Sequence, residues 1–439
     1  MKEGEPRINI GIIGFGTVGG GVGKILLEKR SLLKEKTGIE FNIKKVAVKN
    51  PYKKRAVELP QEILTTSWEE VVSDPDIDII VELIGGTTTA KEIALETLKN
   101  GKWLITANKH LLATNWTELF NIAKEKEVGI KFEASVAGGI PVIRGIKHGL
   151  VANRFREIVG ILNGTTNYIL TMMEKETLSF KKALSLAQER GFAEADPTLD
   201  VSGEDAAHKI AILARLAFSI DFDYEEVYRE GITDIDAFDI VYASELGYKI
   251  KLLAFAKENS GIEVGVFPAL INKDHLLSFV EYEFNAVLAY GDETGPVVFY
   301  GKGAGSGPTA SAVMSDVVEA ARSIISKRKP FVAEYKKTTL KPIENTTHRY
   351  YFRFQVDDKP GVLAKIAGVL GRENISIASV IQKERDLSGG AVPLIIMSHE
   401  AKESNVRNAL KVVEGFEFVR EKPKVIRVIN ITGEYLERA

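Results

Sequence analysis

The feature that most constrains the fold is a glycine-rich step near the start of the chain, between an apolar run and a helical stretch. The run Ile8–Ile13 is rich in Ile and predicts a β-strand, and the stretch Val18–Lys36 predicts a helix. Between them, Gly14-Phe15-Gly16-Thr17-Val18-Gly19 fits the pattern G-x-G-x-x-G. At such a turn the first glycine allows a tight bend, the second lets the backbone approach a pyrophosphate, and the third lets helix and strand pack closely. Because the helix N-terminus also attracts phosphates, the step predicts a dinucleotide-binding turn.

The alternation of strands and helices continues through the first 110 residues. The predicted strands in this part of the chain include apolar runs, which are typical of parallel strands that are buried on both faces. Strand–helix alternation further implies right-handed crossovers, and thus a Rossmann-type α/β domain. We expect this domain to span residues 1–130 plus about 308–332. Its further strands are predicted at Phe41–Val48, Ile77–Ile84 and Trp103–Thr106, and a further helix at Lys91–Asn100 with Gly101 as its C-cap.

From about Ile130 the pattern changes to longer helical segments with strand-like runs between them. This mixture predicts a separate α+β domain over residues 131–307. A glycine-rich loop, Gly301–Gly307, then leads into a helical stretch at Thr309–Lys327. Helices are predicted at Phe180–Gln188, Asp205–Phe218 and Glu245–Asn259, and strands at Glu263–Pro268 and Val297–Tyr300.

The C-terminal part of the chain is separated by a polar stretch that contains Pro342. We interpret residues 333–347 as a linker and residues 348–439 as a third domain. Its elements follow the order β-α-β-β-α-β, which is the ferredoxin-like unit. They are predicted at Arg349–Val356, Val362–Arg372, Ile375–Gln382, Ala391–Ser398, Glu400–Val413 and Lys424–Ile429.

Composition excludes several classes of function. The chain has 439 residues, with 58 basic and 60 acidic side chains, so charge gives no reason to expect nucleic acid or an anionic membrane as a partner. No apolar run approaches the roughly 20 residues of a membrane span, and the first residues lack the apolar stretch of a signal peptide. The absence of cysteine excludes thiolate chemistry and disulfides. We therefore expect a cytoplasmic protein.

The first catalytic candidates lie where a carboxylate-rich segment enters a helix. Residues 196–205 contain four Asp or Glu side chains, and Lys209 follows Asp205 by four residues, on the same helix face. A surface ion pair is one interpretation. However, residues 206–218 are apolar almost all round, which indicates burial, and a buried charged pair is costly unless function retains it.

A second lysine, Lys109, follows the predicted strand Trp103–Thr106. Ligands of open α/β sheets bind beyond the carboxyl ends of the strands, so Lys109 would face them, although spacing alone favours a surface lysine at a helix start. Hydride transfer between a carbinol carbon and nicotinamide needs a proton carrier at oxygen, which a positioned lysine provides. Glu194, Asp200 and Asp205 are available for a substrate ammonium group.

The end of the second predicted strand bears on the choice of dinucleotide. A carboxylate there would favour NAD, but the strand ends in Val48-Lys49-Asn50, followed by Lys53, Lys54 and Arg55. Basic residues such as Lys49 and Arg55 suit the 2′-phosphate of NADP. The same residues are almost equally well explained as ordinary surface charges.

Several of these segments together resemble the homoserine dehydrogenase family. The main match runs from Ala187 through Gly191-Phe192-Ala193-Glu194-Ala195-Asp196-Pro197 to Asp200, Gly203, Asp205 and Lys209 with unbroken spacing. Further matches are Ile161–Leu170, Ala107-Asn108-Lys109 and Gly301–Ala310, and the resemblance covers residues 7–330. It implies interconversion of L-homoserine and L-aspartate 4-semialdehyde with NADP or NAD.

The resemblance also implies roles for individual residues. Lys209 would be the acid/base group at the reacting oxygen, and Lys109 would support it beside the nicotinamide. Glu194 would hold the substrate amino group, with Asp200 nearby, and Asp205 would orient the substrate or Lys209. Gly303 would lie against the cofactor. The complete predicted cofactor set is Gly14, Phe15, Gly16, Thr17, Val18, Gly19, Lys49, Arg55, Gly85, Thr106, Lys109 and Gly303.

Members of this family also bind a monovalent cation, typically sodium, through backbone oxygens. Glu133-Ala134-Ser135-Val136-Ala137-Gly138-Gly139-Ile140 is similar to the stretch that provides them. The implied ligands are the carbonyls of Glu133, Val136, Gly138 and Ile140.

The C-terminal unit resembles an ACT domain, in the segments Asp357–Ala364 and Asn374-Ile375-Ser376-Ile377. Gly361 is expected to form the turn into the first helix. The resemblance implies feedback by an amino-acid effector, for which threonine is the natural guess, but a domain used only for oligomer contacts is equally consistent. The family pairs through its middle domain, so a homodimer is expected, and pairing of ACT domains would give a homotetramer.

Two alternatives to a homoserine dehydrogenase stay open at this point. One is a different amino-acid dehydrogenase on the same scaffold, which would act at an amine and require ammonia. The other is a sensor that binds a dinucleotide and an amino acid without catalysis. Such a sensor would be expected to lose Lys209, Lys109 or Glu194, and all three are present.

Overall fold

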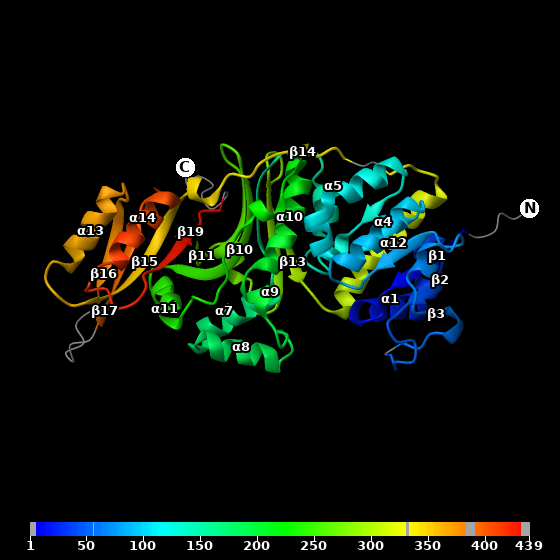
Figure 1. Ribbon diagram of the computed structural model, residues 1–439, viewed down its shortest axis with the longest axis horizontal. Coiled ribbons are helices and arrows are strands. Elements are labelled where there is room, and N and C mark those ends of the chain that lie inside the picture. Colours follow the sequence, from blue (N-terminus) through cyan, green and yellow to red (C-terminus); the bar gives the residue numbers. More distant parts are fainter. Residues whose placement is uncertain (1–5, 56, 331–332, 383–390, 432–439) are drawn as a thin grey trace, which may run out of the picture. The chain divides into compact units, whose positions relative to one another are not determined.

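The computed structural model describes residues 6–55, 57–330, 333–382 and 391–431, so the ends of the first and last expected domains, 1–5 and 432–439, lie outside the described residues. The chain forms two compact units (Figure 1). Unit 1 comprises the chain up to Ile158 together with His208–Tyr224 and Phe284–Thr338. Unit 2 comprises Val159–Ala207, Glu225–Glu283 and the chain from Thr339 onward.

Unit 1 contains a parallel sheet of six strands in the order β3-β2-β1-β4-β5-β6. All residues of β4 and β5 are buried, which explains why their first three residues are apolar without alternation; each strand ends in a buried polar residue, Glu82 and Thr106. The sheet confirms the predicted Rossmann-type fold. The strands are β1 (Arg7–Ile13), β2 (Glu40–Ala47), β3 (Leu64–Thr65), β4 (Ile79–Glu82), β5 (Trp103–Thr106) and β6 (Ile130–Lys131).

Helices α1 (Thr17–Glu28), α4 (Thr88–Lys99), α5 (Lys109–Glu125) and α12 (Ser306–Ile325) pack around this sheet. The predicted single helix at Val18–Lys36 is instead two helices, because α1 ends at Glu28 and α2 (Arg30–Thr37), which buries no residue, turns away after Lys29. A Cβ on Gly21 would lie 2.8 Å from Ser306 Oγ, so α1 and α12 are in close contact. Among the described residues, no helix combines the length and apolar character that a membrane crossing requires.

Unit 1 also holds the short helices α3 (Glu69–Val72) and α6 (Val142–Arg144), and the antiparallel hairpin of β12 (Phe284–Gly291) and β13 (Gly295–Lys302). Two elements run from one unit into the other, namely β7 (Phe155–Ile161) and α10 (Glu204–Phe218). Most of α10 therefore belongs to unit 1, while its first residues belong to unit 2.

The first part of unit 2 combines helices with a long hairpin. The prediction of a helix at Glu245–Asn259 is wrong, since α11 ends at Glu245, Gly247 turns the chain with φ +85°, and Tyr248–Glu258 is the strand β10. This strand is buried continuously from Ile250 to Ala256, so it lacks the alternation that distinguishes a strand from a buried helix. The elements are α7 (Gly164–Glu176), α8 (Phe180–Glu189), α9 (Thr198–Val201), β9 (Tyr228–Arg229), α11 (Ala237–Glu245), β10 and β11 (Ile262–Asn272).

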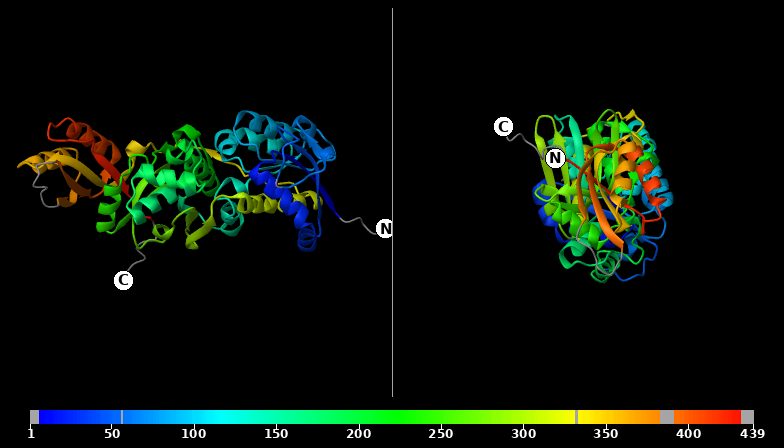
Figure 2. Two further views of the ribbon diagram at one scale, coloured as in Figure 1. Left: turned by 90° about the horizontal axis from the view of Figure 1, so that it is seen from below. Right: turned by 90° about the vertical axis from the view of Figure 1, so that its left-hand side faces the viewer.

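The C-terminal part of unit 2 has the predicted β-α-β-β-α-β order. Its strands lie in the order β19-β15-β17-β16 and are all antiparallel, and α13 and α14 lie side by side on the sheet (Figure 2). Gly361 has φ +90° at the start of α13, as the turn requires. The elements are β15 (Thr347–Asp357), α13 (Val362–Arg372), β16 (Ile377–Gln382), β17 (Ala391–Ser398), α14 (Glu403–Glu414) and β19 (Lys424–Val428).

This C-terminal domain is joined to the rest of unit 2 by a shared sheet. Strand β19 pairs in parallel with β11, and Ile429 N donates to Leu270 O at 3.0 Å, so the strands run continuously as β10-β11-β19-β15-β17-β16. A buried ion pair adds a second connection, in which Arg353 Nε of β15 donates to Asp239 Oδ1 of α11 at 2.7 Å. The domain is thus built into unit 2 rather than only tethered by a linker.

The stability of unit 2 is expected to fall in mildly acidic solution because of His348. Its ring lies edge-on to Phe267 and Tyr350, and burial, aided by the charge of Arg427, lowers the pKa of His348 to about 4 from 6.5. Between these values the unfolded chain binds a proton that the folded chain does not. Stability contributed by the neutral ring is therefore complete above about pH 6.5 and lost as the pH falls toward 4, by at most about 1.4 kcal/mol per pH unit.

Urea unfolding of the wild type and of His348→Phe across this pH window measures the effect. The variant keeps an aromatic ring but cannot take up the proton, so its free energy of unfolding should fall less steeply with acid. Carboxylates titrate in both proteins and cancel in the comparison. Equal slopes in the two proteins would show that His348 is not responsible.

Candidate active site

The predicted dinucleotide turn has the geometry that a pyrophosphate requires. Gly14 has φ +95°, and a Cβ on it would lie 2.7 Å from Leu83 O. A Cβ on Gly19 would lie 2.2 Å from Gly14 O, whereas a Cβ on Gly16 would meet no atom within 4 Å. Gly16 is also the N-cap of α1 and provides no side-chain cap. Gly14 and Gly19 are therefore required by the fold, while Gly16 leaves open space at a helix N-terminus, which fits a dinucleotide phosphate.

The carboxyl ends of β4 and β5 are tied together next to this turn. The buried Glu82 accepts hydrogen bonds from Thr106 Oγ1 at 2.6 Å and from Ile84 N at 2.8 Å, and burial raises the pKa of the Glu82 carboxyl. Asn108 caps α5 by accepting from Leu111 N at 3.0 Å, and its Nδ2 donates to Gly86 O at 2.6 Å. These bonds hold the start of α5, where Lys109 lies. Neither Glu82 nor Asn108 was predicted as a site residue from the sequence.

A stack of aromatic rings joins the two helices of unit 1 on which the predicted lysines lie. The His110 and His208 rings stack with centroids 4.4 Å apart, and Tyr224 stacks on the other side of His208 at 4.8 Å. Farther along the two helices, the buried Arg215 lies over the Trp116 ring. Lys109 and Lys209 are the sequence neighbours of the two stacked histidines, on α5 and α10. Lys209 is half-buried between buried neighbours on α10.

In unit 2, one asparagine holds two of the predicted carboxylates. Asn163 Nδ2 donates to Asp200 Oδ1 at 2.6 Å and to Asp205 Oδ2 at 2.8 Å. Its Oδ1 accepts from Thr166 N at 2.8 Å and caps α7. Asn163 and Asp205 are buried, with 4% and 7% of their surfaces exposed. Sequence reasoning noted Asn163 only as part of a family motif, although its place before the N-terminus of a helix could have suggested the cap.

The third predicted carboxylate is in a different environment. Glu194 is exposed on the segment that follows α8, and its backbone carbonyl accepts from Gln188 Nε2 at 3.1 Å. Thr165 Oγ1 donates to Phe192 O at 2.6 Å and so connects this segment to the start of α7, two residues after Asn163. Glu194 is therefore attached to the same part of unit 2 as Asp200 and Asp205, but its carboxylate is open to solvent.

The predicted cation-binding segment forms a tight loop whose two ends are bridged by a carboxylate. The buried Glu133 accepts from Ile143 N at 2.9 Å and from Arg144 N at 2.8 Å, and burial raises the pKa of the Glu133 carboxyl. Between these ends, Ala137 and Gly138 both have φ +55°, a left-handed bend. Within the described chain, no donor is bonded to the carbonyl oxygens of Val136 and Gly138. Such carbonyls fit a monovalent cation.

The second glycine-rich loop packs against this segment. A Cβ on Gly138 would lie 2.5 Å from Gly303 O, and a Cβ on Gly303 would lie 2.1 Å from the amide carbon of Asn285. Asn285 is 1% exposed, and both polar atoms of its amide lack a hydrogen-bond partner in the described structure. Unsatisfied polar groups are rare in protein interiors, so a polar ligand or water at this loop would fit them.

The basic residues after β2 have different roles in the structure. The guanidinium of Arg55 donates to the carbonyl oxygens of Pro51, at 3.1 Å, Lys53, at 2.8 Å, and Asn50. Arg55 thus holds the turn that follows β2. Lys49 is exposed at the carboxyl end of that strand.

Three family models match successive parts of the chain. Residues 14–133 match the model described as "Homoserine dehydrogenase, NAD binding domain", and residues 141–318 match that described as "Homoserine dehydrogenase". Residues 350–415 match the ACT domain.

Individual proteins and structures agree with these models. The homoserine dehydrogenase of Neisseria gonorrhoeae is 40% identical over 432 residues, which cover 97% of this chain and 99% of that protein. The crystal structure of a homoserine dehydrogenase from Thiobacillus denitrificans superposes with a TM-score of 0.91 and 42% identity, covering 97% of this chain and 98% of that one. A hyperthermophilic archaeal homoserine dehydrogenase in complex with NADPH is similar with a TM-score of 0.62 and 26% identity, over 74% of this chain and 99% of that one. The chain therefore belongs to the homoserine dehydrogenase family and carries a C-terminal ACT domain.

Proposed function

We propose that this homoserine dehydrogenase interconverts L-homoserine and L-aspartate 4-semialdehyde at a site built on α10. The observation that carries the proposal is the stack of His208 on His110, which joins α10 to α5 at the residues that adjoin Lys209 and Lys109 in sequence. Asp205 lies one helical turn before Lys209 on α10 and so shares its face. A proton carrier and a carboxylate for an ammonium group then occupy neighbouring turns of a single helix.

The residues of the chain act on the substrate oxygen and the amino group. In the oxidative direction, Lys209 removes the proton of the substrate hydroxyl, and in reverse it returns the proton to the forming alkoxide. Lys109 adds positive charge that stabilises this oxygen. Glu194, Asp200 and Asp205 hold the substrate ammonium group, and Asn163 keeps the last two in place. The bound nicotinamide supplies or accepts the hydride.

NADP is the proposed dinucleotide. Gly14, Gly16 and Gly19 accommodate the pyrophosphate, and the exposed Lys49 at the end of β2 is placed for a 2′-phosphate, on a turn held by Arg55. The similar archaeal enzyme is in complex with NADPH. Gly85, Thr106 and Gly303 complete the proposed cofactor contacts.

Further properties are proposed from the family. The carbonyls of Glu133, Val136, Gly138 and Ile140 bind a monovalent cation, sodium being the proposed ion. The ACT domain binds an amino-acid effector, with threonine the first to test. The protein works in the cytoplasm as a homodimer paired through the middle domain, or as a homotetramer.

The proposed activity is tested by following nicotinamide reduction with L-homoserine and NADP. Wild-type protein should turn over, whereas Lys209→Ala should lose about 10²- to 10⁴-fold in kcat, the usual contribution of a general base, and still bind NADP. Lys182→Ala, an exposed lysine on α8, is the control and should be unaffected. The same assay with sodium replaced by tetramethylammonium tests whether turnover depends on the proposed monovalent cation. Normal turnover of Lys209→Ala would contradict the mechanism.

Asn163 allows a sharper test of the carboxylate arrangement. Asn163→Ser and Asn163→Asp both keep an oxygen that can cap α7, but both remove the donors to Asp200 and Asp205. Loss of hydrogen bonds to charged groups should raise the KM for homoserine about 10- to 100-fold, more in the Asp variant, where a third carboxylate repels the other two. The KM for NADP should stay constant.

The control for this test is Asn153→Ala, which removes the oxygen that accepts hydrogen bonds from Glu293 N and Thr294 N at the turn between β12 and β13. It should lower stability without changing either KM. A KM for homoserine that is unchanged in both Asn163 variants would show that the asparagine only caps a helix.

The preference for NADP is tested with Lys49→Glu. A carboxylate at the end of β2 repels a 2′-phosphate and can accept hydrogen bonds from the ribose hydroxyls of NAD. The ratio of kcat/KM for NADP to that for NAD should fall by about tenfold or more, in line with loss of one charge-assisted contact. An unchanged ratio would place the 2′-phosphate elsewhere.

A further inference from the structure

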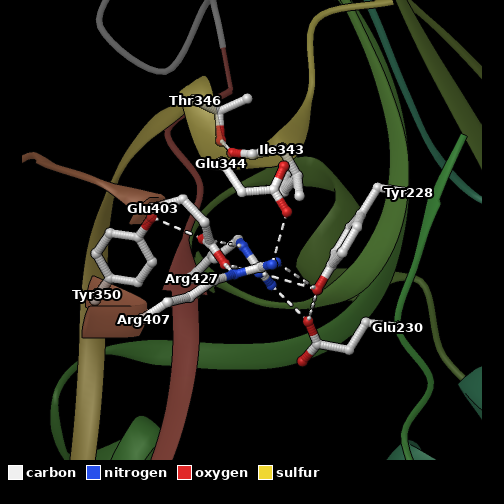
Figure 3. Close-up of polar contacts among 9 residues, drawn as sticks. All are labelled: Tyr228, Glu230, Ile343, Glu344, Thr346, Tyr350, Glu403, Arg407 and Arg427. Carbon is white, nitrogen blue, oxygen red and sulfur yellow. Dashed lines mark hydrogen bonds and ion pairs between the residues drawn. The ribbon is translucent and has the colours of Figure 1, made fainter. Parts of the chain in front are cut away.

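A buried cluster of charged side chains lies where the ACT domain joins the rest of unit 2 (Figure 3). At its centre, Arg427 of β19 and Glu403 at the start of α14 form a two-pronged ion pair, with Nε to Oε2 at 3.0 Å and Nη2 to Oε1 at 2.6 Å. Both residues are about 95% buried, at 5% and 4% exposure. Tyr350 donates a further hydrogen bond to Glu403 Oε2 at 2.9 Å, and Arg407 Nε donates to Glu403 Oε1 at 3.0 Å.

The cluster reaches out of the ACT domain to the end of β9. Arg427 Nη1 donates to Glu230 Oε2 at 2.7 Å. Tyr228 Oη accepts from Arg427 Nη2 at 3.3 Å and from Arg407 Nη2 at 3.4 Å, and it donates to Glu230 Oε2 at 3.0 Å. The Arg427 guanidinium also lies over the rings of Tyr228 and Phe267. The ACT domain therefore holds two residues of a segment that lies outside it. We call Tyr228, Glu230, Tyr350, Glu403, Arg407 and Arg427 the junction cluster.

The sheet explains why these elements meet. Strand β10 pairs with β11 along its full length, so only the other edge of β11 is available to β9 and β19. Strand β9 pairs there with Gly265 and Val266, and β19 pairs a few residues farther on, with Ala269 and Leu270. The end of β9 and the ACT domain consequently lie next to each other along a single strand edge.

The other side of the same segment contacts residues 201–204, which lie between the proposed substrate-binding residues Asp200 and Asp205. Between Tyr228 and Glu230 in sequence, Arg229 Nε lies 3.2 Å from Glu204 Oε2, and Glu204 is the residue that precedes Asp205. Ile232 N donates to Val201 O at 2.9 Å. A Cβ on Gly231 would lie 2.1 Å from Val201 O, so the two backbones are in direct contact and only glycine fits.

Residues 228–232 are thus held on one side by the junction cluster and on the other by residues 201–204. Burial alone would lower the pKa of Arg427, but the negative charges of Glu230 and Glu403 outweigh this effect and raise it. Arg427 therefore stays charged within the cluster. A buried network of this kind rearranges as a whole rather than residue by residue, since a single displaced member would leave a charge without its partner.

We propose that residues 228–232 are a positioning segment, through which the ACT domain sets the place of the Asp200 and Asp205 carboxylates and so the affinity for the amino-acid substrate. The inference rests on the proposed function, since it assumes that Asp200 and Asp205 hold the substrate ammonium group. Any change of the ACT domain that moves Arg427 or Glu403 is transmitted through residues 228–232 to residues 201–204. Arg229 and Arg427 are positioning residues, because neither touches the substrate.

The test perturbs the two sides of the segment separately in the full-length protein. Arg229→Gln removes the charge that faces Glu204, and Arg427→Lys keeps the charge of the cluster but loses the two-pronged ion pair. Each variant should raise the KM for homoserine about two- to thirtyfold, the range for residues on a coupled path, while the KM for NADP stays within about twofold. The double variant should show less than the product of the two effects, because both act through one segment.

Asp236→Asn is the matched control. It removes the ion pair between Asp236 of the main part of unit 2 and Arg353 of the ACT domain, a connection outside the positioning segment. This variant should lower the melting temperature and leave both KM values unchanged. If Arg427→Lys does not fold, Tyr228→Phe, which removes one hydroxyl from the junction cluster, replaces it with the same expectation.

The outcomes separate this inference from the proposed function. If the wild type does not oxidise homoserine, the proposed function fails and the inference fails with it. If the wild type is active and the segment variants lose only thermal stability, the cluster is merely structural and the inference alone is overturned. Multiplicative effects in the double variant, or an equal rise in KM in Asp236→Asn, would likewise overturn it.

Discussion

The contact on which the proposed chemistry depends is the stack of His208 on His110. It lies between a helix that starts at the carboxyl end of a parallel sheet and the middle of an apolar helix, α10. In the proposed site the ammonium groups of Lys109 and Lys209 would repel each other, so the proposal requires a rigid contact between the helices that carry them. The stack provides one without adding charge, and Tyr224 closes its other side.

Carboxylates present the opposite problem in unit 2, where Asp200 and Asp205 lie close enough to share one asparagine. Their mutual repulsion is a cost, and in the proposed site the charge of a substrate ammonium group between them would offset it. Asn163 is suited to this task because its amide offers two donors and no charge. In the proposed site, binding of the substrate would relieve the repulsion between these like charges and so favour a substrate that carries an amino group.

Sequence patterns predicted most of the fold because they report local geometry. Gly14 and Gly361 are at positions that require positive φ, and the runs Trp103–Thr106 and Ala391–Ser398 coincide with observed strands. The helix predicted at Glu245–Asn259 was wrong because a strand buried on both faces and a buried helix have the same continuous apolar sequence. Asn163 was missed in its role, since a hydrogen bond to residues 37 and 42 positions away leaves no periodic trace.

By itself, the sequence determined the dinucleotide-binding turn, the order of elements in the βαββαβ domain, and the presence of a lysine and carboxylates on α10, because each of these elements is specified by backbone limits or spacing within its own short segment. Only the tertiary structure decided what these parts contact. The strand edge of β11 that joins the ACT domain to residues 228–232 is formed by segments more than 150 residues apart, and the charged cluster beside it consists of ordinary Arg and Glu residues. Nothing local distinguishes such residues from solvated surface charges, since their partners come from distant parts of the chain.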